Sequence, residues 1–490
     1  MPDTELSRSP GVQSSANVIS SPVVMEDFCI GCGVCAGVCP SGSLAMEICG
    51  GQYRPVQCGP CPDRCGLCLR VCPLADCAEN GATLAEEVFA EEAGLKQDAL
   101  LGRYLETHVG AVGDAGNRAR SASGGAAGLI LRGLLQCRRV DAVAAVVPTG
   151  EGRPWHAYEI LTTPQELGAS AGSAYQPVHL ENVLKGILAG PERLYAITAL
   201  PCFAKALRKA QKHLPELRRR VAFVLGLTCG GCPSLAYAQA ESMLAGVAEP
   251  KQVFYRRKSN TGSSRNLDFV AIDPAGKEHR LSLQGTGGFL WANRACLYKG
   301  CWFCDDVFAE LADATFMDAW LKEYEADPRG TSLVVMRRRE LLELLEKQRA
   351  TGAWQGRPIA PDRVVASQAK QVRNKRLLLR GRVELLRKEG KWAPPVRDCP
   401  LCDDGRLAAT AARRSLAVFQ AHGSLRGKLA QWLEGNVGRS LSPLGAKLAG
   451  WRLCWQVAAC LRKHGVKPSH RNGVILLGRI LAPFLGGGGW

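Results

Sequence analysis

Three kinds of segment are missing from the sequence, and each absence narrows the class of protein. No run of about 18 apolar residues occurs, so we expect no transmembrane helix. Residues 1–21 contain no basic start followed by an apolar stretch and no twin-arginine motif, so we expect no export signal. A disulfide framework is also missing, because the 22 cysteines include short-spaced groups rather than an even spread. The sequence predicts a cytoplasmic protein whose cysteine groups bind metal.

Acidic residues are nearly absent from residues 405–490, where thirteen Lys and Arg accompany Glu434 alone. This segment holds +12 of the net charge of +17, and the preceding 404 residues hold +5. Apolar residues at helical spacing occur at 425–433 and 451–461. The pattern is typical of a tail that contacts a membrane surface or an acidic partner, or of a small helical cap packed on the body. No aromatic-interleaved basic motif occurs, so we expect no nucleic-acid partner.

Composition and length indicate an ordinary globular protein of about three domains. The apolar fraction is 46% and the charged fraction is 22%, which excludes disordered and fibrous classes. Residues 1–20 are polar and Ser-rich and read as a flexible tail, and residues 21–80 are dense in Cys, Gly and Pro. An acidic helical connector is expected over 82–105, an α/β body after it, and a basic helical tail over 396–490.

Hydrophobic patterning predicts the elements of the α/β body. Residues 140–147, 194–200 and 221–227 read as buried strands, each followed by a helix. Amphipathic helices are expected at 203–213 and 234–245, a small antiparallel hairpin over 255–283, and a basic helical stretch over 337–391.

The first cysteine run has the spacing of a bacterial four-iron ferredoxin. Cys29, Cys32, Cys35 and Cys39 follow C-x2-C-x2-C-x3-C and precede a proline, a loop that can wrap a cubane cluster. A second run, Cys61, Cys65, Cys68 and Cys72, ends in the same way but has a first interval one residue longer. Cys58 lies three residues before Cys61 and is an alternative first ligand.

In such modules the last cysteine of each run reaches the other cluster. One cluster is then predicted at Cys29, Cys32, Cys35 and Cys72, and the other at Cys61 (or Cys58), Cys65, Cys68 and Cys39. A structural zinc site is the less favoured interpretation, because zinc motifs lack the paired Cys-Pro endings. Cys49 and Cys77 fall outside both runs and are expected to be ordinary thiols. Residues 21–80 are therefore a predicted two-cluster 4Fe-4S ferredoxin-type domain that depends on metal for its fold.

A further cysteine set lies in the body. Cys202 follows the strand at 194–200, and Cys229 follows the strand at 221–227. If these strands are parallel, both sulfurs lie at the carboxyl edge of the sheet, where α/β proteins bind ligands. Cys301 and Cys304 supply a short C-x-x-C pair, so four sulfurs can complete another cubane. Cys296 is the first substitute ligand and Cys232 the next.

Several segments together resemble one family. They are SASGG at 121–125, AGSAY at 171–175, TALPC at 198–202, GLTC at 226–229, CWFC at 301–304 and DATFMDAW at 313–320. In this order they are similar to motifs of the family of coenzyme F420 hydrogenase/dehydrogenase beta subunits, over about residues 20–380. The resemblance implies an N-terminal family domain over 81–190 and a C-terminal family domain over 191–395. It points independently to the same four body cysteines.

The resemblance also implies a non-covalent FAD. Clusters carry one electron at a time and deazaflavin or nicotinamide chemistry moves hydride, so a flavin must convert between them. Ser123, Gly124 and Gly125 precede a helical stretch, and their backbone N–H groups are candidates to hold an FAD phosphate. The alternative interpretation of these residues is a helix N-cap with a tight turn.

The sequence thus favours an iron–sulfur flavoprotein oxidoreductase of mixed α+β and α/β fold. It would pass electrons between ferredoxin-type 4Fe-4S clusters and FAD, and would oxidise or reduce a hydride-carrying small substrate such as coenzyme F420. The expected partner is a redox protein or a small electron-carrying molecule. The alternative function is a non-catalytic electron-transfer subunit of a larger complex. Cys399 and Cys402 form a lone pair, interpreted as incidental or as a weak zinc site in preference to a redox disulfide. No catalytic residue is predicted.

Overall fold

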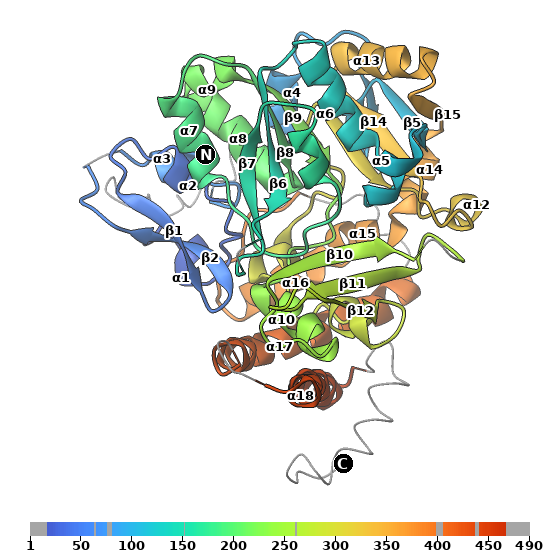
Figure 1. The fold of residues 1–490 in the computed structure, drawn as a ribbon. Helices are drawn as coiled ribbons and strands as arrows, with labels where there is room; N and C mark the ends of the chain where they lie inside the picture. The colour runs from blue at the N-terminus through green and yellow to red at the C-terminus, as the bar shows by residue number, and fades with distance from the viewer. Residues whose placement is uncertain are drawn as a thin grey trace, which may run out of the picture.

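The computed structural model describes residues 17–62, 65–75, 81–150, 152–259, 262–397, 405–436 and 441–466. At its centre lies an eight-stranded mixed sheet in the order β15-β5-β14-β13-β9-β8-β6-β7 (Figure 1). Strands β6, β8, β9 and β13 are parallel, and the other four join by antiparallel pairing. The strands are β5 (Glu106–Val112), β6 (Ala142–Pro148), β7 (His156–Leu161), β8 (Tyr195–Ala199), β9 (Val221–Leu227), β13 (Ala314–Asp318), β14 (Ser332–Met336) and β15 (Trp354–Pro358).

Both faces of the sheet are buried because its central strands are apolar on both sides. Ala196 and Phe223 face one layer, formed by α6 (Ala126–Gln136) and α13 (Arg339–Ala350). Ile197 and Val224 belong to the core on the other side, with α7 (Glu181–Ala189), α8 (Pro201–His213) and α9 (Pro215–Arg220). The shorter helices of the body are α4 (Gly81–Val88), α5 (Ala115–Arg120), α11 (Phe289–Ala292), α12 (Lys322–Glu325), α14 (Pro361–Ser367) and α15 (Ala369–Val372).

The three predicted strands are confirmed as β6, β8 and β9, and β8 and β9 are parallel neighbours. A helix follows β8, but the expected helix after β6 is wrong. The next element is β7, which pairs antiparallel with β6. Its burial alternates imperfectly, as an edge strand with one partner allows.

Three further predictions need correction. The hairpin expected over 255–283 is a three-stranded sheet of β10 (Gln252–Lys258), β11 (Leu267–Ile272) and β12 (Glu278–Ser282). The connector is helical only to Val88, after which β3 (Lys96–Asp98) and β4 (Gly102–Tyr104) form a small hairpin. The basic stretch over 337–391 contains β15, whose single buried aromatic side chain, Trp354, gives too weak a period to predict a strand.

The cysteine-rich module packs directly on the body. It consists of α1 (Pro22–Met25), α2 (Val34–Gly37), β1 (Leu44–Cys49), β2 (Gln52–Gln57) and α3 (Leu67–Arg70). Helix α2 lies against α7, and the backbone N–H of Leu180 donates a 2.9 Å hydrogen bond to the carbonyl of Cys32. Gly33 has φ +74°, and a Cβ there would lie 2.9 Å from the Cβ of His179. The module and the face of the sheet that carries α7 and α8 share one hydrophobic core.

The C-terminal helices also pack on the body. These are α17 (Gly405–Glu434) and α18 (Pro443–Lys463), drawn in red at the bottom of Figure 1, and they contact α10 (Leu235–Leu244). Helix α17 also contacts α16 (Leu379–Lys388). Its Arg426 pairs with Asp27 of the module, and its Ala430 and Leu433 lie against the turn between β1 and β2. In the described residues the tail is therefore a helical cap. Among those residues, none of the helices combines the length and apolar character that crossing a bilayer requires.

Candidate functional site

Two strand ends bring Cys202 and Cys229 to one edge of the central sheet. Ala199 at the end of β8 is the register partner of Gly226 near the end of β9, so both chains leave the sheet side by side. Cys202 follows in the first turn of α8, and Cys229 lies two residues after β9. The placement follows from parallel pairing, because the carboxyl ends of parallel strands meet at the same edge.

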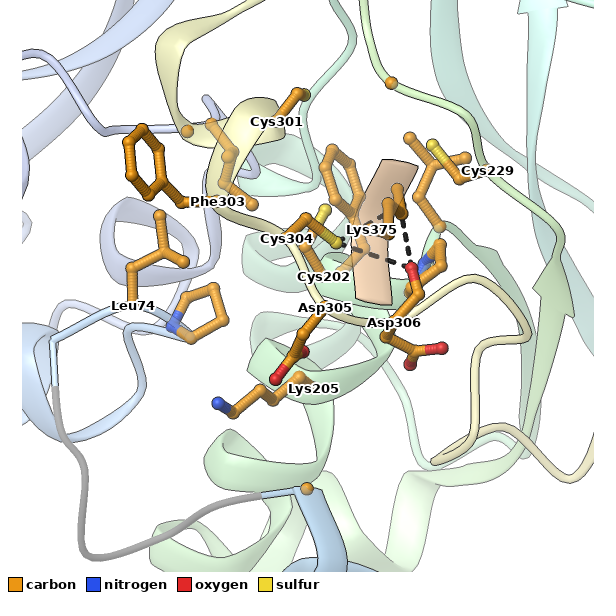
Figure 2. Close-up of a pocket in the computed structure, with 18 of the residues that line it drawn as sticks. Leu74, Cys202, Lys205, Cys229, Cys301, Phe303, Cys304, Asp305, Asp306 and Lys375 are labelled. Carbon is orange, nitrogen blue, oxygen red and sulfur yellow. Dashed lines mark hydrogen bonds between the residues drawn. The ribbon is translucent and has the colours of Figure 1, made fainter. Parts of the chain in front are cut away.

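Cys301 and Cys304 approach the same edge from a short loop. Cys301 lies within the 3-10 turn Lys299–Phe303, and Cys304 directly follows it. All four sulfur-bearing residues line one pocket, shown in Figure 2. Burial raises the pKa of Cys202 well above its usual value, and the nearby sulfurs of Cys304, Cys229 and Cys301 raise it further. The pKa values of Cys202, Cys229 and Cys301 are all raised, first by burial, and thiols that do not easily ionise alone suit a cluster whose iron compensates the thiolate charge.

The two substitute cysteines occupy different places. Cys232 lines the pocket, and its backbone N–H donates a 3.2 Å hydrogen bond to Sγ of Cys301. Cys296 is buried outside the pocket lining, and its thiol lies near Glu241 instead. The geometry therefore keeps Cys232 beside the four cysteines and separates Cys296 from them.

Lys375 enters the pocket from the π-helical turn Arg373–Leu377. Its ammonium donates a 3.2 Å hydrogen bond to Sγ of Cys304 and a 2.7 Å bond to the carbonyl of Asp306 (Figure 2). Burial lowers the pKa of Lys375, but the sulfurs of Cys304 and Cys229 raise it, and the net shift is upward. The pocket thus holds a positive charge next to its sulfurs.

Arg294 is the second cation near the four cysteines. Its guanidinium lies over the ring of Trp302, 4.7 Å from the centroid, and donates to the carbonyl of Gly230 at 3.2 Å. Its Nε is buried and has no hydrogen-bond partner among the described residues. Burial lowers the pKa of Arg294, whereas the sulfurs of Cys301 and Cys229 oppose that shift. A buried donor without a partner among the described residues, on a guanidinium close to Cys301 and Cys229, fits an anionic group in this space.

The predicted ligands of the module form two sets, an inner set of Cys29, Cys32, Cys35 and Cys72 and an outer set of Cys39, Cys61, Cys65 and Cys68. The inner set lies next to the body. Burial, with a smaller contribution from Cys72, raises the pKa of Cys32 to about 12. The pKa of Cys35 is raised well above its usual value by burial, then by Cys32, Cys29 and Cys72. Cys72, the last cysteine of the second run, thus lies close to the cysteines of the first run.

The outer set lies nearer the solvent. Burial raises the pKa of Cys68, and its sulfur neighbours are Cys61 and Cys65. Cys58, the alternative to Cys61, instead donates from its thiol to the carbonyl of Gly42. Cys39 lies 3.5 Å from the hydroxyl of Ser41. The arrangement favours Cys61 over Cys58 as the partner of Cys65 and Cys68.

The inner set and the body set are adjacent. Cys32 is among the neighbours that raise the pKa of Cys202, after the three other body cysteines. Tyr158 lies close to both sets, because Cys202 and Cys32 each contribute to the raised pKa of its hydroxyl after burial. The cysteine sets therefore form a series from the surface of the module to the sheet edge.

A large cavity of about 790 Å³ lies on the other side of the body cysteines. Cys229 and Cys232 line both this cavity and the cysteine pocket. The cavity is bounded by the strand ends of the sheet and by β10 of the small sheet. It has the position in which open α/β sheets bind their ligands, beyond the carboxyl ends of the strands.

The predicted phosphate loop borders this cavity in part. Ser123 and Gly125 line it, whereas Gly124 packs beneath it against the backbone of Gly110 and Ser332. Gly125 has φ +89° and no side chain to cap α6, so the first N–H groups of this helix have no side-chain cap. The hydroxyl of Ser123 is already used, since it donates to the carbonyl of Thr331 at 2.6 Å.

The cavity wall is strongly basic. Its charged lining residues in the described chain are Arg120, Arg132, Arg256, Arg257, Lys258, Arg265, Lys370 and the carboxylate of Asp318. Lys258 donates to the carbonyls of Arg118, Ser123 and Arg329 at 2.6, 2.8 and 2.6 Å, which ties three loops together. Burial, followed by Arg118, lowers the pKa of Lys258 to about 8. A cavity of this size and charge suits a large anionic ligand.

Sequence reasoning missed the three cations that define the site electrostatically. Lys375, Arg294 and Lys258 lie in ordinary basic segments, and spacing alone does not separate them from solvent-facing charges. Cys77, Cys399 and Cys402 lie outside the described residues. Within the described part of the chain, no three His, Cys, Asp or Glu side chains are arranged to hold a single metal ion.

Comparison with protein families agrees with this architecture. Residues 22–44 match the 4Fe-4S binding domain. Residues 107–185 match the N-terminal part, and residues 192–362 the C terminus, of the coenzyme F420 hydrogenase/dehydrogenase beta subunit. The fold and these matches define an iron–sulfur oxidoreductase. The chain belongs to the family of coenzyme F420 hydrogenase/dehydrogenase beta subunits.

Two curated proteins and one solved structure illustrate the relationship. The chain is 22% identical over 215 residues to the F subunit of the F(420)H(2) dehydrogenase of Methanosarcina mazei, covering 42% of this chain and 54% of that protein. It is 25% identical over 223 residues to the coenzyme F420-dependent sulfite reductase of Methanocaldococcus jannaschii, covering 42% and 31%. A chain of the F420-reducing [NiFe] hydrogenase complex of Methanosarcina barkeri aligns over 62% of this chain and 99% of its own, with 18% identity and a TM-score of 0.46. The chain thus spans only part of both curated relatives.

Proposed function

We propose that this protein passes electrons along three 4Fe-4S clusters to or from an FAD, coupled to oxidation or reduction of a hydride-carrying small molecule. The outer cluster would use Cys39, Cys61, Cys65 and Cys68, the inner cluster Cys29, Cys32, Cys35 and Cys72, and the body cluster Cys202, Cys229, Cys301 and Cys304. The proximity of the sulfurs within each of the inner and body sets supports this assignment. The two halves of the body, 81–190 and 191–395, would enclose the FAD between them.

The FAD is assigned to the 790 Å³ cavity. Ser123, Gly125 and the N-terminus of α6 would face its pyrophosphate, together with Arg120 and Arg132. When bound, FAD supplies the change from two-electron hydride transfer to one-electron transfer. The protein's own contribution is to hold the phosphates with basic side chains and to keep the body cysteines at the cavity wall.

The observation that carries the proposal is the shared lining of Cys229 and Cys232. Because both residues border the cysteine pocket and the cavity, a cluster and a flavin in these two spaces would be immediate neighbours. Electron transfer between them then requires no movement of the protein. The alternative of a non-catalytic electron-transfer subunit is less favoured, because it gives no role to a large basic cavity beside a cysteine set.

The substrate class is proposed from the two curated relatives, whose names refer to coenzyme F420. A deazaflavin with phosphate or carboxylate groups would match the basic wall of the cavity. A redox protein would exchange electrons at the outer cysteine set, which lies nearest the solvent.

Anaerobic purification followed by cofactor analysis tests the proposal. We expect about 12 iron atoms and about 12 sulfide ions per chain, four of each per cluster, together with one releasable FAD. Adding reduced coenzyme F420 should bleach the flavin absorbance and produce electron paramagnetic resonance (EPR) signals of reduced clusters. Iron near four atoms per chain, or no flavin, would contradict it.

We also propose that the tail contacts an anionic membrane surface. Helix α18 carries Lys447, Arg452, Arg462 and Lys463 and no acidic residue. Leu444 at its start is 67% exposed, and Trp451 and Trp455 are half-buried at helical spacing from it. Leu and Trp beside basic residues are typical of helices that lie in a membrane interface. Binding to a protein partner instead would appear as vesicle-independent association.

A further inference from the structure

Two positive groups, the buried Lys375 and the partly buried Arg294, lie close to the body cysteines without a carboxylate to balance them. Lys375 is 2% exposed, and in the described chain no carboxylate lies within ion-pair distance of it or of Arg294. Two neighbouring arginines, in contrast, have a carboxylate partner. Arg376, next to Lys375, pairs with Glu310 at 2.5 Å, and Arg397 binds the same carboxylate.

An unbalanced ammonium is costly to bury, so its position needs a compensating negative group. A 4Fe-4S cluster with four cysteine thiolates supplies that charge. An oxidised cubane core carries two positive charges and its four thiolates carry four negative ones, so the complex is a dianion, and reduction adds one more negative charge. Both Lys375 and Arg294 would therefore interact more strongly with the reduced cluster than with the oxidised one.

We propose that Lys375, assisted by Arg294, sets the reduction potential of the body cluster by stabilising its reduced form. This inference rests on the proposed third cluster. The contact is direct, because the ammonium donates to Sγ of Cys304, and hydrogen bonds to cluster sulfurs and nearby charges are the known means of raising a cluster potential. Lys375 thus acts by stabilising the extra negative charge of the reduced cluster, and it takes no part in a chemical step.

The module cysteines have a different environment. The described hydrogen bonds to their sulfurs come from neutral groups, such as the N–H of Gly31 to Cys29 at 3.4 Å and the N–H of Val18 to Cys68 at 3.3 Å. Lys209 lies beside the inner set, but it donates to the carbonyl of Cys72 at 3.1 Å. Lys209 and Lys205 both oppose the rise in the pKa of Cys72, but among the described hydrogen bonds an ammonium donates to a cysteine sulfur in the body set alone. We infer that the body cluster has a higher reduction potential than the inner cluster. A single electron shared by these two clusters would then reside mainly on the body cluster, beside the cavity.

The local backbone explains how the ammonium is held. The π-helical turn Arg373–Leu377 rotates Lys375 toward the cysteines while Arg376 reaches Glu310. The carbonyl of Asp306, two residues after Cys304, accepts a second hydrogen bond from the ammonium. The segment after the C-x-x-C pair thus fixes the cation that contacts its last sulfur.

Potentiometric titration of the anaerobic full-length protein, followed by EPR, tests this role. We expect Lys375→Met to lower the potential of one cluster by at least about 59 mV, which is a tenfold change in its one-electron equilibrium. Lys375→Arg keeps the charge and should retain most of the potential, and Arg294→Met should cause a smaller decrease. Lys347→Met is the matched control, because it removes an exposed lysine on α13.

The outcomes separate this inference from the proposed function. An unchanged potential in Lys375→Met, with its iron intact, overturns the inference. Loss of about four iron atoms in Lys375→Met but not in Lys375→Arg supports it, since the charge is then required to hold the cluster. Equal loss in both variants overturns it, because shape rather than charge would then matter. If the wild-type protein shows no third cluster signal, the proposed function fails instead.

Discussion

The backbone N–H of Tyr53 donates a 2.9 Å hydrogen bond to the hydroxyl of Tyr298. Tyr53 lies on β2 of the module, and Tyr298 lies three residues before Cys301. Gly300, two residues after Tyr298, allows this loop to lie close to the module, since a Cβ there would lie 2.1 Å from the carbonyl oxygen of Phe28. The loop that carries the body cysteines is therefore shaped partly by the module.

This junction leads to a first prediction. Gly300→Ala should displace the loop or the module, and we expect a loss of body-cluster iron and a decrease of roughly 1–3 kcal/mol in the free energy of unfolding, as for an overpacked core position. Gly423→Ala is the control, because a Cβ there meets nothing within 4 Å. Iron analysis and denaturant unfolding under anaerobic conditions measure both effects. Equal behaviour of the two variants would show that the contact is not restrictive.

A second prediction concerns the module. Cys32→Ala should remove about four iron atoms per chain and destabilise residues 21–80, because metal binding supplies most of the folding energy of so small a unit. Cys68→Ala should remove the outer cluster with a similar loss of iron. Cys49→Ala is the control, since this exposed thiol lies outside both runs. Unchanged iron in the Cys32 and Cys68 variants would contradict the ligand assignment.

The third prediction separates the body cluster from the flavin. Cys229→Ala should remove about four iron atoms and interrupt electron transfer from flavin to the module, while FAD stays bound through the basic side chains of the cavity. Cys137→Ala removes an exposed cysteine of the body and should change neither property. Stopped-flow absorbance would follow flavin and cluster reduction separately. A Cys229 variant with full iron content would show that this residue is not a ligand.

The fourth prediction is a pH dependence of flavin retention. Lys258 has a pKa of about 8 in the folded protein, below its ordinary value of 10.5, so its charge is lost as the pH rises through about 8. An ammonium has three N–H donors and a neutral amine has two, so one of the three loop contacts then fails. We expect FAD affinity to decrease between about pH 7 and pH 9 by fluorescence titration.

Burial and charged neighbours set the pKa of Lys258, and a variant that lacks this side chain is the control. Arg118 and Arg256 lower its pKa, and Asp318 and Asp327 raise it. Lys258→Met should bind FAD weakly at every pH and lose the step near pH 8. A step that persists in this variant would assign the titration to another group.

The fifth prediction tests the membrane surface of α18. The double variant Lys447→Glu/Arg452→Glu should reduce sedimentation with vesicles that contain phosphatidylglycerol, and high salt should reduce binding of the wild-type protein. Lys347→Glu/Arg349→Glu makes the same charge change on exposed residues of α13 and is the control. Vesicles of phosphatidylcholine alone should bind little. Equal sedimentation of both double variants would exclude α18 as the contact.

Much of the candidate site could be predicted because it depends on local spacing and on parallel pairing. The close cysteine intervals allow few arrangements, and the strands before Cys202 and Cys229 lead both residues to one edge of the sheet. The sequence could not predict that Cys296 lies outside the pocket of the four body cysteines. Its separation from the pocket results from α10 and α18, which enclose it in a different core with Glu241.

The electrostatic part could not be predicted, because a basic residue in a helical stretch is normally exposed. Lys375 is buried within a π-helical turn, which changes the helical register locally and which the sequence does not signal. The tail illustrates a similar limit. Its amphipathic pattern fits both a cap and a docking surface, and the contacts of Arg426 and Leu433 with the module depend on tertiary structure.

The difference in solvent exposure between the outer and inner cysteine sets has a consequence for damage by oxygen. Cys61 is exposed, whereas Cys32, Cys35 and Cys72 are buried. Oxidants would therefore reach the proposed outer cluster before the proposed inner one, and brief contact with air should remove the outer cluster first. Protein handled in this way would have lost the proposed terminal at which an external redox protein exchanges electrons. Activity assayed with an artificial acceptor and activity assayed with the natural one would then decline at different rates.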